Sequence, residues 1–498
     1  MSLYWNFNPL GITGALTPVS GVRGVFVSSG SVPVSSAMTV TGGTVANGYP
    51  GNRLYVYSRG KAIEQTVASG GRMYVCSGGA AGGITALFSG RLDVSSGGVA
   101  SNTTVISNGT IIVSSGAVAV NITVDSGGIV SCYTGASALN VDWTPCVGFV
   151  QPNSATITYA NPLSGVYFGS GEQLLSHTAV MDGKTLAGKG CSMFVFSGGT
   201  ATSTTVSSGG RLYIQSDGVA ESVTLLGSLY ISSGAVAHST TVSSGGWMYV
   251  SRGGVASDTD FIGNRLYIFG EGNNTVVSSG SLSLLSGGIA YNTTLYGGQF
   301  GINASCSAIG LVIFSGGSTQ MYSGGFASDV IIRSGGYMNF SSGGRAENIT
   351  VDINGYLAIR DGGFVADVIE NGGNVGTANR GSATFVSHIF TGMVNSSATV
   401  HSNTVASDVQ IGSGGRMIVY SGGKASGTVI DNYGSVSVQS SGSTVMATVS
   451  NGGTLLISRG GVASETVVSS GGVMYVAWGA TDVNTTVEEG ATYINENE

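Results

Sequence analysis

Carboxylates and amides recur along this sequence at nearly regular intervals, and carboxylates gathered on one face can act as acid and base on a polysaccharide. The recurring residues are Glu64, Asn102, Asn121, Asn140, Asp258, Asn292, Asp329, Asn348, Asp367 and Glu465. No two of these acids stand one repeat apart. Stacked asparagines favour another interpretation, a ladder of hydrogen bonds at a turn. We therefore predict a structural column, and keep a β-helical polysaccharide lyase or hydrolase as an alternative.

The histidines and one glycine-containing segment offer less chemistry. The histidines have no metal-ligand spacing, so we expect isolated, solvated side chains at His177, His238, His388 and His401. The segment DGKT at 182–185 ends like a phosphate-binding loop, but the glycine required five residues before Gly183 is Thr178. We predict no catalytic residue, no metal site and no cofactor, and hence no enzyme.

The cysteines are too few and too scattered for a disulfide framework: Cys76, Cys132, Cys146, Cys191 and Cys306. Cys132 and Cys146 are near enough in sequence to close a loop in an oxidising compartment. Cys132 also falls at an inward position, where cysteine acts as a small apolar residue. Both alternatives stay open.

Tyrosine recurs at another point of the repeat, between two apolar positions. The candidate contact residues are Tyr74, Tyr213, Tyr249 and Tyr475, with Tyr230 in a related unit. Because side chains alternate along a strand, these rings should face outward. Such rings can stack on sugars or on a second copy of the chain. The simpler explanation is that tyrosine suits a sheet surface.

Arginine occupies the first position of three successive units, at Arg53, Arg72 and Arg91. This row could hold an anionic sugar, or it could be a set of solvated charges at a corner. Nonspecific binding of nucleic acid needs an extended basic surface, whereas the whole chain has a net charge of −7.

All of these side chains are positioned by one short unit that repeats. A glycine that ends a turn returns every 19 residues in two series, Gly71, Gly90, Gly109 and Gly128, and then Gly415, Gly434, Gly453 and Gly472. A unit of this length cannot bury a core alone. Successive units, here termed coils, must therefore stack as a solenoid.

The pattern within a coil predicts strands. Counting from the turn glycine as position zero, positions two and four are apolar, as in Leu92 and Val94. Alternation with period two predicts a strand with one face inward. Position ten is usually alanine, as at Ala100, which indicates a narrow buried corner. We predict an all-β fold, a single-chain parallel β-helix with coils of about 19 residues, right-handed by the bias of parallel crossovers.

Composition agrees with a secreted or surface-exposed rod. Only 9% of the residues are charged, and the mean hydropathy of +0.29 comes from the apolar columns. No run of 18 apolar residues occurs, so we expect no transmembrane helix. The opening segment MSLYWNFNPLGITG has no basic region followed by a long apolar run, so we expect no signal peptide within it.

The glycine columns lapse twice, near 141–190 and 376–395. We interpret both stretches as irregular inserts on a continuous solenoid. The expected organisation is a cap at 1–50, repeats at 51–140, an insert at 141–190, repeats at 191–375, an insert at 376–395, and repeats with a second cap at 396–498.

The repeat resembles that of a known family. The units VSSGGRLYIQSDGVAESVT (206–224), VSSGGWMYVSRGGVASDTD (242–260) and SNGGTLLISRGGVASETV (450–467) are similar to the repeats of AIDA-type autotransporter passengers. Those are bacterial adhesins that display β-helical rods outside the cell.

The resemblance implies adhesion, autoaggregation or biofilm contacts, with surface glycans or further copies of the chain as partners. It also implies a cell-surface or secreted location and glycosylation of Ser or Thr. A phage fibre or tailspike-like receptor-binding protein is the alternative from the same fold.

Overall fold

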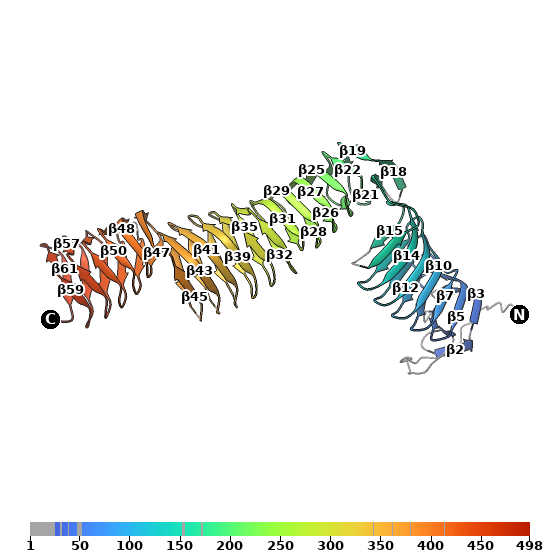
Figure 1. The fold of residues 1–498 in the computed structure, drawn as a ribbon, viewed down its shortest axis with the longest axis horizontal. Helices are drawn as coiled ribbons and strands as arrows, with labels where there is room; N and C mark the ends of the chain where they lie inside the picture. Colours follow the sequence, from blue (N-terminus) through green and yellow to red (C-terminus); the bar gives the residue numbers. More distant parts are fainter. Residues whose placement is uncertain are drawn as a thin grey trace. The chain divides into compact units, whose positions relative to one another are not determined.

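The structure is a computed structural model that describes residues 25–29, 32–37, 39–46, 52–151, 155–170, 173–341, 343–360, 362–378, 380–412 and 414–498. All of its regular elements are β-strands (Figure 1). The chain forms two compact units. Unit 1 comprises Met1–Met181, Leu186–Thr200 and Gly209–Leu212, and unit 2 comprises Asp182–Thr185, Ala201–Ser208 and Tyr213–Glu498. Residues 1–24 of the expected N-terminal cap lie outside the described residues.

The first sheet of unit 1 has the strand order β15-β13-β11-β9-β6-β4-β1-β2. Its strands are β1 (Val25–Ser29), β2 (Val32–Ala37), β4 (Asn52–Val56), β6 (Arg72–Val75), β9 (Arg91–Val94), β11 (Thr110–Val113), β13 (Ile129–Cys132) and β15 (Phe149–Gln151). From β4 to β15 neighbouring strands pair in parallel. Leu92 is the partner of Ile111 and Val94 that of Val113, and all four are fully buried. The predicted parallel stacking is confirmed.

The second sheet of unit 1 forms the other long face of the same coils. Its main strands are β3 (Thr39–Ala46), β5 (Lys61–Ala68), β7 (Ala80–Gly82), β10 (Val99–Val105), β12 (Val118–Val124), β14 (Ser137–Trp143) and β16 (Thr156–Tyr159). Position ten stacks in register through Ala81, Ala100, Ala119 and Ala138, each at most 3% exposed. The buried alanine corner is therefore confirmed.

The turn glycine is required by the approach of the preceding coil. A Cβ atom at Gly109 would lie 2.0 Å from the backbone oxygen of Ala86, and one at Gly90 would lie 1.9 Å from that of Val67. No side chain fits at such distances, so these two coils require glycine at position zero. Other residues occupy the equivalent position at Asn52, Asn264 and Ser396. Glycine thus recurs every 19 residues because the backbones of successive coils approach each other closely at this position.

Antiparallel pairing occurs within the stretch 141–190 and just beyond it, as far as Val195. Strand β17 (Val166–Ser170) pairs antiparallel with both β18 (Gln173–Thr178) and β21 (Cys191–Val195). The Trp143 ring packs edge-on against Phe194 at 5.4 Å, and its Nε1 donates to the Gly148 oxygen at 3.1 Å. Strands and an aromatic cluster thus occupy this stretch, and its extent as an insert remains an interpretation.

Unit 2 repeats the two-sheet arrangement. Along one face the order includes β26 (Ser228–Ile231), β28 (Trp247–Val250), β30 (Arg265–Ile268), β32 (Ser281–Leu284), β35 (Gly298–Ile302), β38 (Gly317–Met321), β40 (Tyr337–Phe340), β42 (Tyr356–Ile359) and β44 (Asn374–Thr377). That sheet ends at β44. A new sheet follows with β47 (Ser397–Val400), β49 (Arg416–Val419), β52 (Ser435–Val438), β55 (Thr454–Ile457), β58 (Val473–Val476) and β61 (Thr492–Asn495).

The other face of unit 2 also changes sheet at the same place. Its strands include β27 (Val236–Val242), β29 (Val255–Phe261), β31 (Glu271–Val277), β39 (Phe326–Ile332), β41 (Arg345–Asp352) and β43 (Phe364–Asn371), and, beyond the change, β46 (His388–Val394) and β48 (Thr404–Ile411). Strands β45 (Ser382–Phe385) and β46 both lie entirely within 376–395. The second lapse of the glycine column thus coincides with a change of sheet.

All five cysteines are free. Cys132 is fully buried and Cys146 is 6% exposed. Burial raises the pKa of each of these two thiols to about 11, so both stay protonated near neutral pH. Of the two alternatives for Cys132, a disulfide with Cys146 or a small apolar residue in the core, the structure shows the second.

Position thirteen carries a buried threonine in several coils. Within the described part of the chain, the hydroxyl oxygen has no hydrogen-bond partner at Thr103, Thr240, Thr259, Thr428 and Thr466. Other coils place an apolar side chain at this position. The positions equivalent to Thr428 in the adjacent coils are Val409 and Ala447, both buried.

We expect Ala100→Leu to lower the free energy of unfolding by about 1–3 kcal/mol, because a larger side chain overfills the buried corner. Ser101→Leu, at the neighbouring half-exposed position, should have a much smaller effect. Thermal unfolding of both variants tests this, and equal shifts would contradict the alanine corner.

We expect Thr428→Val to raise the free energy of unfolding by about 1 kcal/mol, because it removes a buried hydroxyl without a partner and keeps the branched shape. Thr428→Ser retains the hydroxyl and loses the methyl group, so it should be less stable than the parent. A valine variant that unfolds at a lower temperature than the parent would show that the hydroxyl is satisfied in solution.

Candidate functional site

The candidate tyrosines lie on the outer surface of their strands. Tyr74, Tyr213, Tyr249 and Tyr475 are each partly exposed between two buried neighbours. The outward orientation predicted from strand alternation is therefore observed. Their role in contacts with other molecules remains a proposal.

Two of the four tyrosines belong to one ladder in unit 2. Tyr213 stacks on Tyr230 with ring centroids 4.9 Å apart and an interplanar angle of 11°. The ring centroids of Tyr230 and Tyr249 are 6.5 Å apart, and those of Tyr249 and Phe269 are 5.0 Å apart. Partial burial raises the pKa of the Tyr249 hydroxyl, which stays protonated and able to donate a hydrogen bond. We name Tyr213, Tyr230, Tyr249 and Phe269 the aromatic ladder.

The other two tyrosines lie elsewhere. Tyr74 stacks on Tyr55 at 4.9 Å in unit 1. The Tyr475 hydroxyl donates a hydrogen bond to the Glu496 carboxylate, and this bond raises the pKa of Tyr475. The sequence thus identified the outward column but not its division into separate groups. Tyr55 and Phe269 were missed from the sequence alone. Tyr55 could have been found, because Leu-Tyr follows arginine at Arg53 just as it does in later coils.

A polar groove interrupts the aromatic column in unit 2. In register after Tyr267 come Ser283, Gly301 and Gln320, so large rings give way to small or amide side chains. A groove of about 420 Å³ lies over these coils. Its lining is Ser281, Ser283, Leu285, Gln299, Phe300, Gly301, Asn303, Ser318, Gln320 and Tyr322. The groove offers hydroxyl and amide groups beside one exposed ring.

The column of carboxylates and amides occupies a left-handed corner. All ten of its residues have φ between 50° and 57°. Asparagine and aspartate tolerate this conformation better than most residues do. In unit 1 Asn121 Nδ2 donates to Asn102 Oδ1 at 2.9 Å, and Asn140 Nδ2 donates to Asn121 Oδ1 at 2.7 Å. The predicted ladder is confirmed.

The carboxylates of this column take part in the same ladders. Asn274 Nδ2 donates to Asp258 Oδ1 at 2.9 Å, and Asn348 Nδ2 donates to Asp329 Oδ1 at 3.3 Å. Asn274 was missed because it follows Asp258 after 16 residues instead of 19. These acids act as acceptors that link coils, and this is a structural use of the carboxylate.

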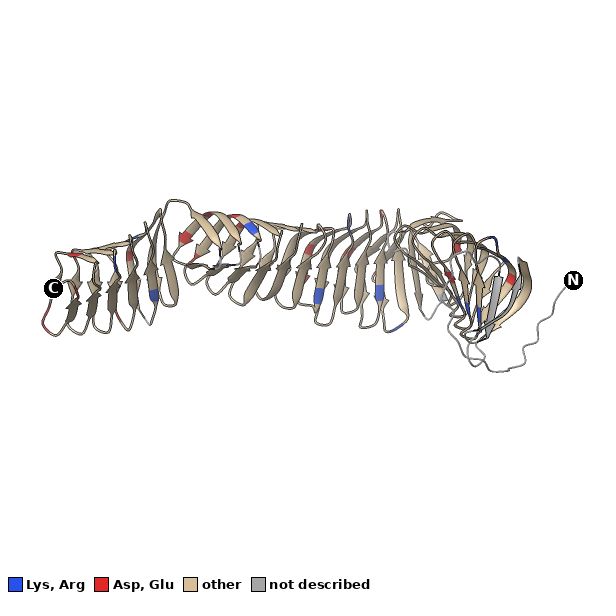
Figure 2. Ribbon diagram, turned by 90° about the horizontal axis from the view of Figure 1, so that it is seen from below, with Lys and Arg blue, Asp and Glu red and all other residues tan. Residues whose placement is uncertain are grey.

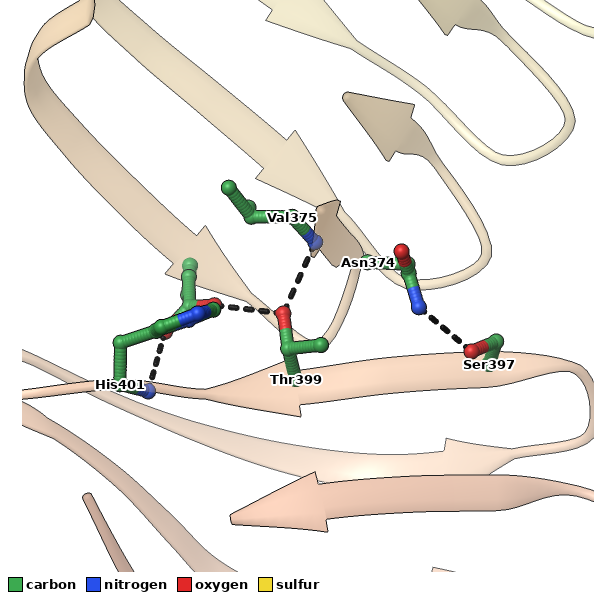
Figure 3. A network of polar contacts seen from close by, with 6 residues as sticks. Asn374, Val375, Ser397, Thr399 and His401 are labelled. Atoms are coloured by element: carbon green, nitrogen blue, oxygen red, sulfur yellow. Dashed lines mark hydrogen bonds and ion pairs between the residues drawn. The ribbon is translucent and has the colours of Figure 1, made fainter. Parts of the chain in front are cut away.

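A histidine and a buried carboxylate meet where the sheets of unit 2 change (Figure 3). Glu370 is fully buried at the end of β43, and its Oε1 lies 2.5 Å from Nδ1 of His401. Glu370 Oε1 also accepts from the Thr399 hydroxyl at 2.6 Å, and Oε2 accepts from the His401 backbone N–H at 2.8 Å. The Thr399 hydroxyl in turn accepts from the Val375 N–H at 2.8 Å.

This network corrects the expectation that the histidines are isolated and solvated. The His401 ring stacks between Phe385 at 4.3 Å and Tyr420 at 4.5 Å, and its side chain is 14% exposed. His177 and His388 also have hydrogen-bond partners. The sequence could not show the Glu370–His401 pair, because its members are 31 residues apart and occur once.

The Glu370–His401 pair joins strands and is not arranged for catalysis. The carboxylate accepts three hydrogen bonds from this chain and has no exposed surface. A substrate therefore has no access to it. The pair connects residues on either side of the sheet change and satisfies backbone groups that the interrupted ladder leaves unpaired.

In the part of the chain that the structure describes, no three His, Cys, Asp or Glu residues are grouped so as to hold a metal ion. The same residues contain no helix long and apolar enough to span a membrane.

We expect His401→Ala to lower the free energy of unfolding of this region by about 1–3 kcal/mol, because the fully buried Glu370 would lose one of its three hydrogen-bond partners. Amide hydrogen exchange of Val375 and Thr399 measures this locally. His238→Ala, at an exposed histidine on β27, is the control. Unchanged protection in both variants would show that the pair does not stabilise the junction.

A family model matches one part of this chain. The AIDA family model, described as the adhesin of the bacterial autotransporter system and a probable stalk, matches residues 395–434. A search among curated proteins finds no significant match.

Two solved structures are similar to the chain. One is a TibC-catalysed hyper-glycosylated fragment of TibA, with 24% identity over 90% of this chain and 99% of that chain and a TM-score of 0.19. The other is the receptor binding domain of the Siphovirus 9NA tailspike, with 11% identity over 88% of this chain and 73% of that chain and a TM-score of 0.09. The fold assignment therefore rests on the strand pairing of this chain.

The match at 395–434 covers β47, β48, β49, β50 (Lys424–Ser426) and β51 (Val429–Ile430), so it falls on coils of the described solenoid. The resemblance to AIDA-type autotransporter stalk repeats is therefore confirmed at residues 395–434, a stretch separate from the three units that suggested it.

Proposed function

We propose that this chain is a non-catalytic adhesive stalk that acts at the bacterial cell surface or after secretion. Its partners would be surface glycans or further copies of the same chain. The family match at residues 395–434 supports the stalk role. Glycosylation of Ser or Thr, which the AIDA resemblance implies, belongs to the same proposal.

The aromatic ladder is the observation that carries the contact role. Successive coils present Tyr213, Tyr230 and Tyr249 on one outer face, with rings close enough to form a continuous apolar strip. Aromatic rings on a polar surface stack on sugar rings or on other aromatic groups. Because coils repeat, many weak contacts can act together, and their combined avidity exceeds that of any single contact.

We expect replacement of Tyr213, Tyr230 and Tyr249 by threonine to weaken autoaggregation or glycan binding by about tenfold or more, because each stacking contact contributes about 0.5–1.5 kcal/mol. Threonine suits a sheet surface, so the fold should persist. Settling of cells that display the chain, and binding to a glycan array, measure the effect.

The matched control replaces three exposed tyrosines outside the ladder and outside the polar groove, Tyr133, Tyr296 and Tyr433. Both triple variants should unfold near the temperature of the parent. If the ladder variant aggregates cells and binds glycans as well as this control does, the ladder is only a sheet surface and the contact role is wrong.

A further inference from the structure

Positive charge is concentrated near the start of the chain. Residues 1–92 contain six Lys or Arg residues and one acid, Glu64, whereas residues 93–498 contain twelve Lys or Arg and 24 Asp or Glu. Charged residues are otherwise sparse along the strands (Figure 2). A net positive region in a chain of net charge −7 calls for a physical explanation.

Three of the arginines form a row across adjacent strands of unit 1. Arg53 is the register partner of Arg72 across β4 and β6, and Arg72 is that of Arg91 across β6 and β9. Neighbouring strands lie roughly 4.8 Å apart, so the outer two arginines are separated by roughly 10 Å. In the next coil the row ends, because Arg91 is paired with Thr110.

The middle arginine of this row is uncompensated. Arg91 forms an ion pair with Asp93 at 2.6 Å, and a hydrogen bond to the Tyr55 side chain raises the pKa of Arg53. Arg72 is exposed and has neither a hydrogen bond nor an ion pair with any residue that the structure describes. Like charges directly opposite one another in a sheet are destabilising, so the row favours an anion.

An aromatic row lies beside the arginine row on the same face. Tyr55 and Tyr74 follow Arg53 and Arg72 by two residues, so they point the same way from β4 and β6. Their rings stack at 4.9 Å with an interplanar angle of 12°. In β9 the equivalent residue is Asp93, which closes the aromatic row and neutralises Arg91.

We propose that the outer face of β4, β6 and β9 binds an acidic saccharide. Arg72 and Arg53 hold the carboxylate or sulfate groups, through the charge-assisted hydrogen bonds that guanidinium groups form with such anions. The rings of Tyr55 and Tyr74 pack against the sugar. This site lies in unit 1 and does not depend on the contact role of the aromatic ladder in unit 2.

The test compares Arg72→Gln with Arg416→Gln in the full chain. Arg416 is also exposed at the first position of its coil, but its register partners are Ser397 and Ser435, so it is not part of a row. The two variants lose the same charge from equivalent positions. The immobilised probes are heparin, which carries sulfates, polygalacturonate, which carries only carboxylates, and neutral dextran.

We expect the parent and Arg416→Gln to bind an acidic polymer and not dextran, and Arg72→Gln to bind about tenfold more weakly, as the loss of a charged hydrogen bond predicts. Binding should also weaken as salt is raised. Retention on heparin alone would identify sulfate as the recognised group, and retention on polygalacturonate would identify carboxylate.

Relief of like-charge repulsion should leave Arg72→Gln at least as thermally stable as the parent, so weaker binding would not reflect unfolding. The proposal is overturned if the parent binds neither acidic polymer, if dextran binds equally well, or if the two variants bind alike. None of these outcomes bears on the aromatic ladder, because its residues are unchanged in every variant.

Discussion

Parallel stacking in register is the constraint on which the rest of this structure depends. Each coil is hydrogen-bonded to the one before it, as when the Thr110 N–H donates to Gly90 and the Ile129 N–H donates to Gly109, both at 2.9 Å. Every position must therefore suit the same position of its neighbours. This is why glycine returns where backbones nearly touch, alanine where a corner is narrow, and asparagine where the backbone is left-handed.

Features that repeat could be predicted from the sequence, and features that occur once could not. The inward strand at Ile111, the corner at Ala100 and the hydrogen bonds of Asn121 all follow from columns, because the same local requirement is met in many coils. The pair Glu370–His401 has no column, since it forms only where the sheets of unit 2 change. Asn274 was hidden by a shortened coil.

The outward positions are less constrained by stacking, and candidate function is concentrated there. Packing requires little of a side chain at position one or three beyond suitability for a sheet surface. Repetition then converts single residues into extended surfaces. The aromatic ladder of unit 2 and the arginine row of unit 1 are two such surfaces, with different chemistry. A stalk built in this way can combine several weak contacts without any catalytic group.

Cysteine pairs placed across adjacent coils test the stacking most directly. Ile112 and Ser131 are register partners on β11 and β13, and a separation of roughly 4.8 Å lies within the range that a disulfide can bridge. Ile129 lies two residues before Ser131, so it should be roughly 8 Å from Ile112. Under mild oxidation, with linked peptides mapped by mass spectrometry, the account predicts rapid linkage of Ile112→Cys with Ser131→Cys and little linkage of Ile112→Cys with Ile129→Cys. Equal linkage of the two pairs, or linkage of the second pair alone, would contradict parallel stacking in register.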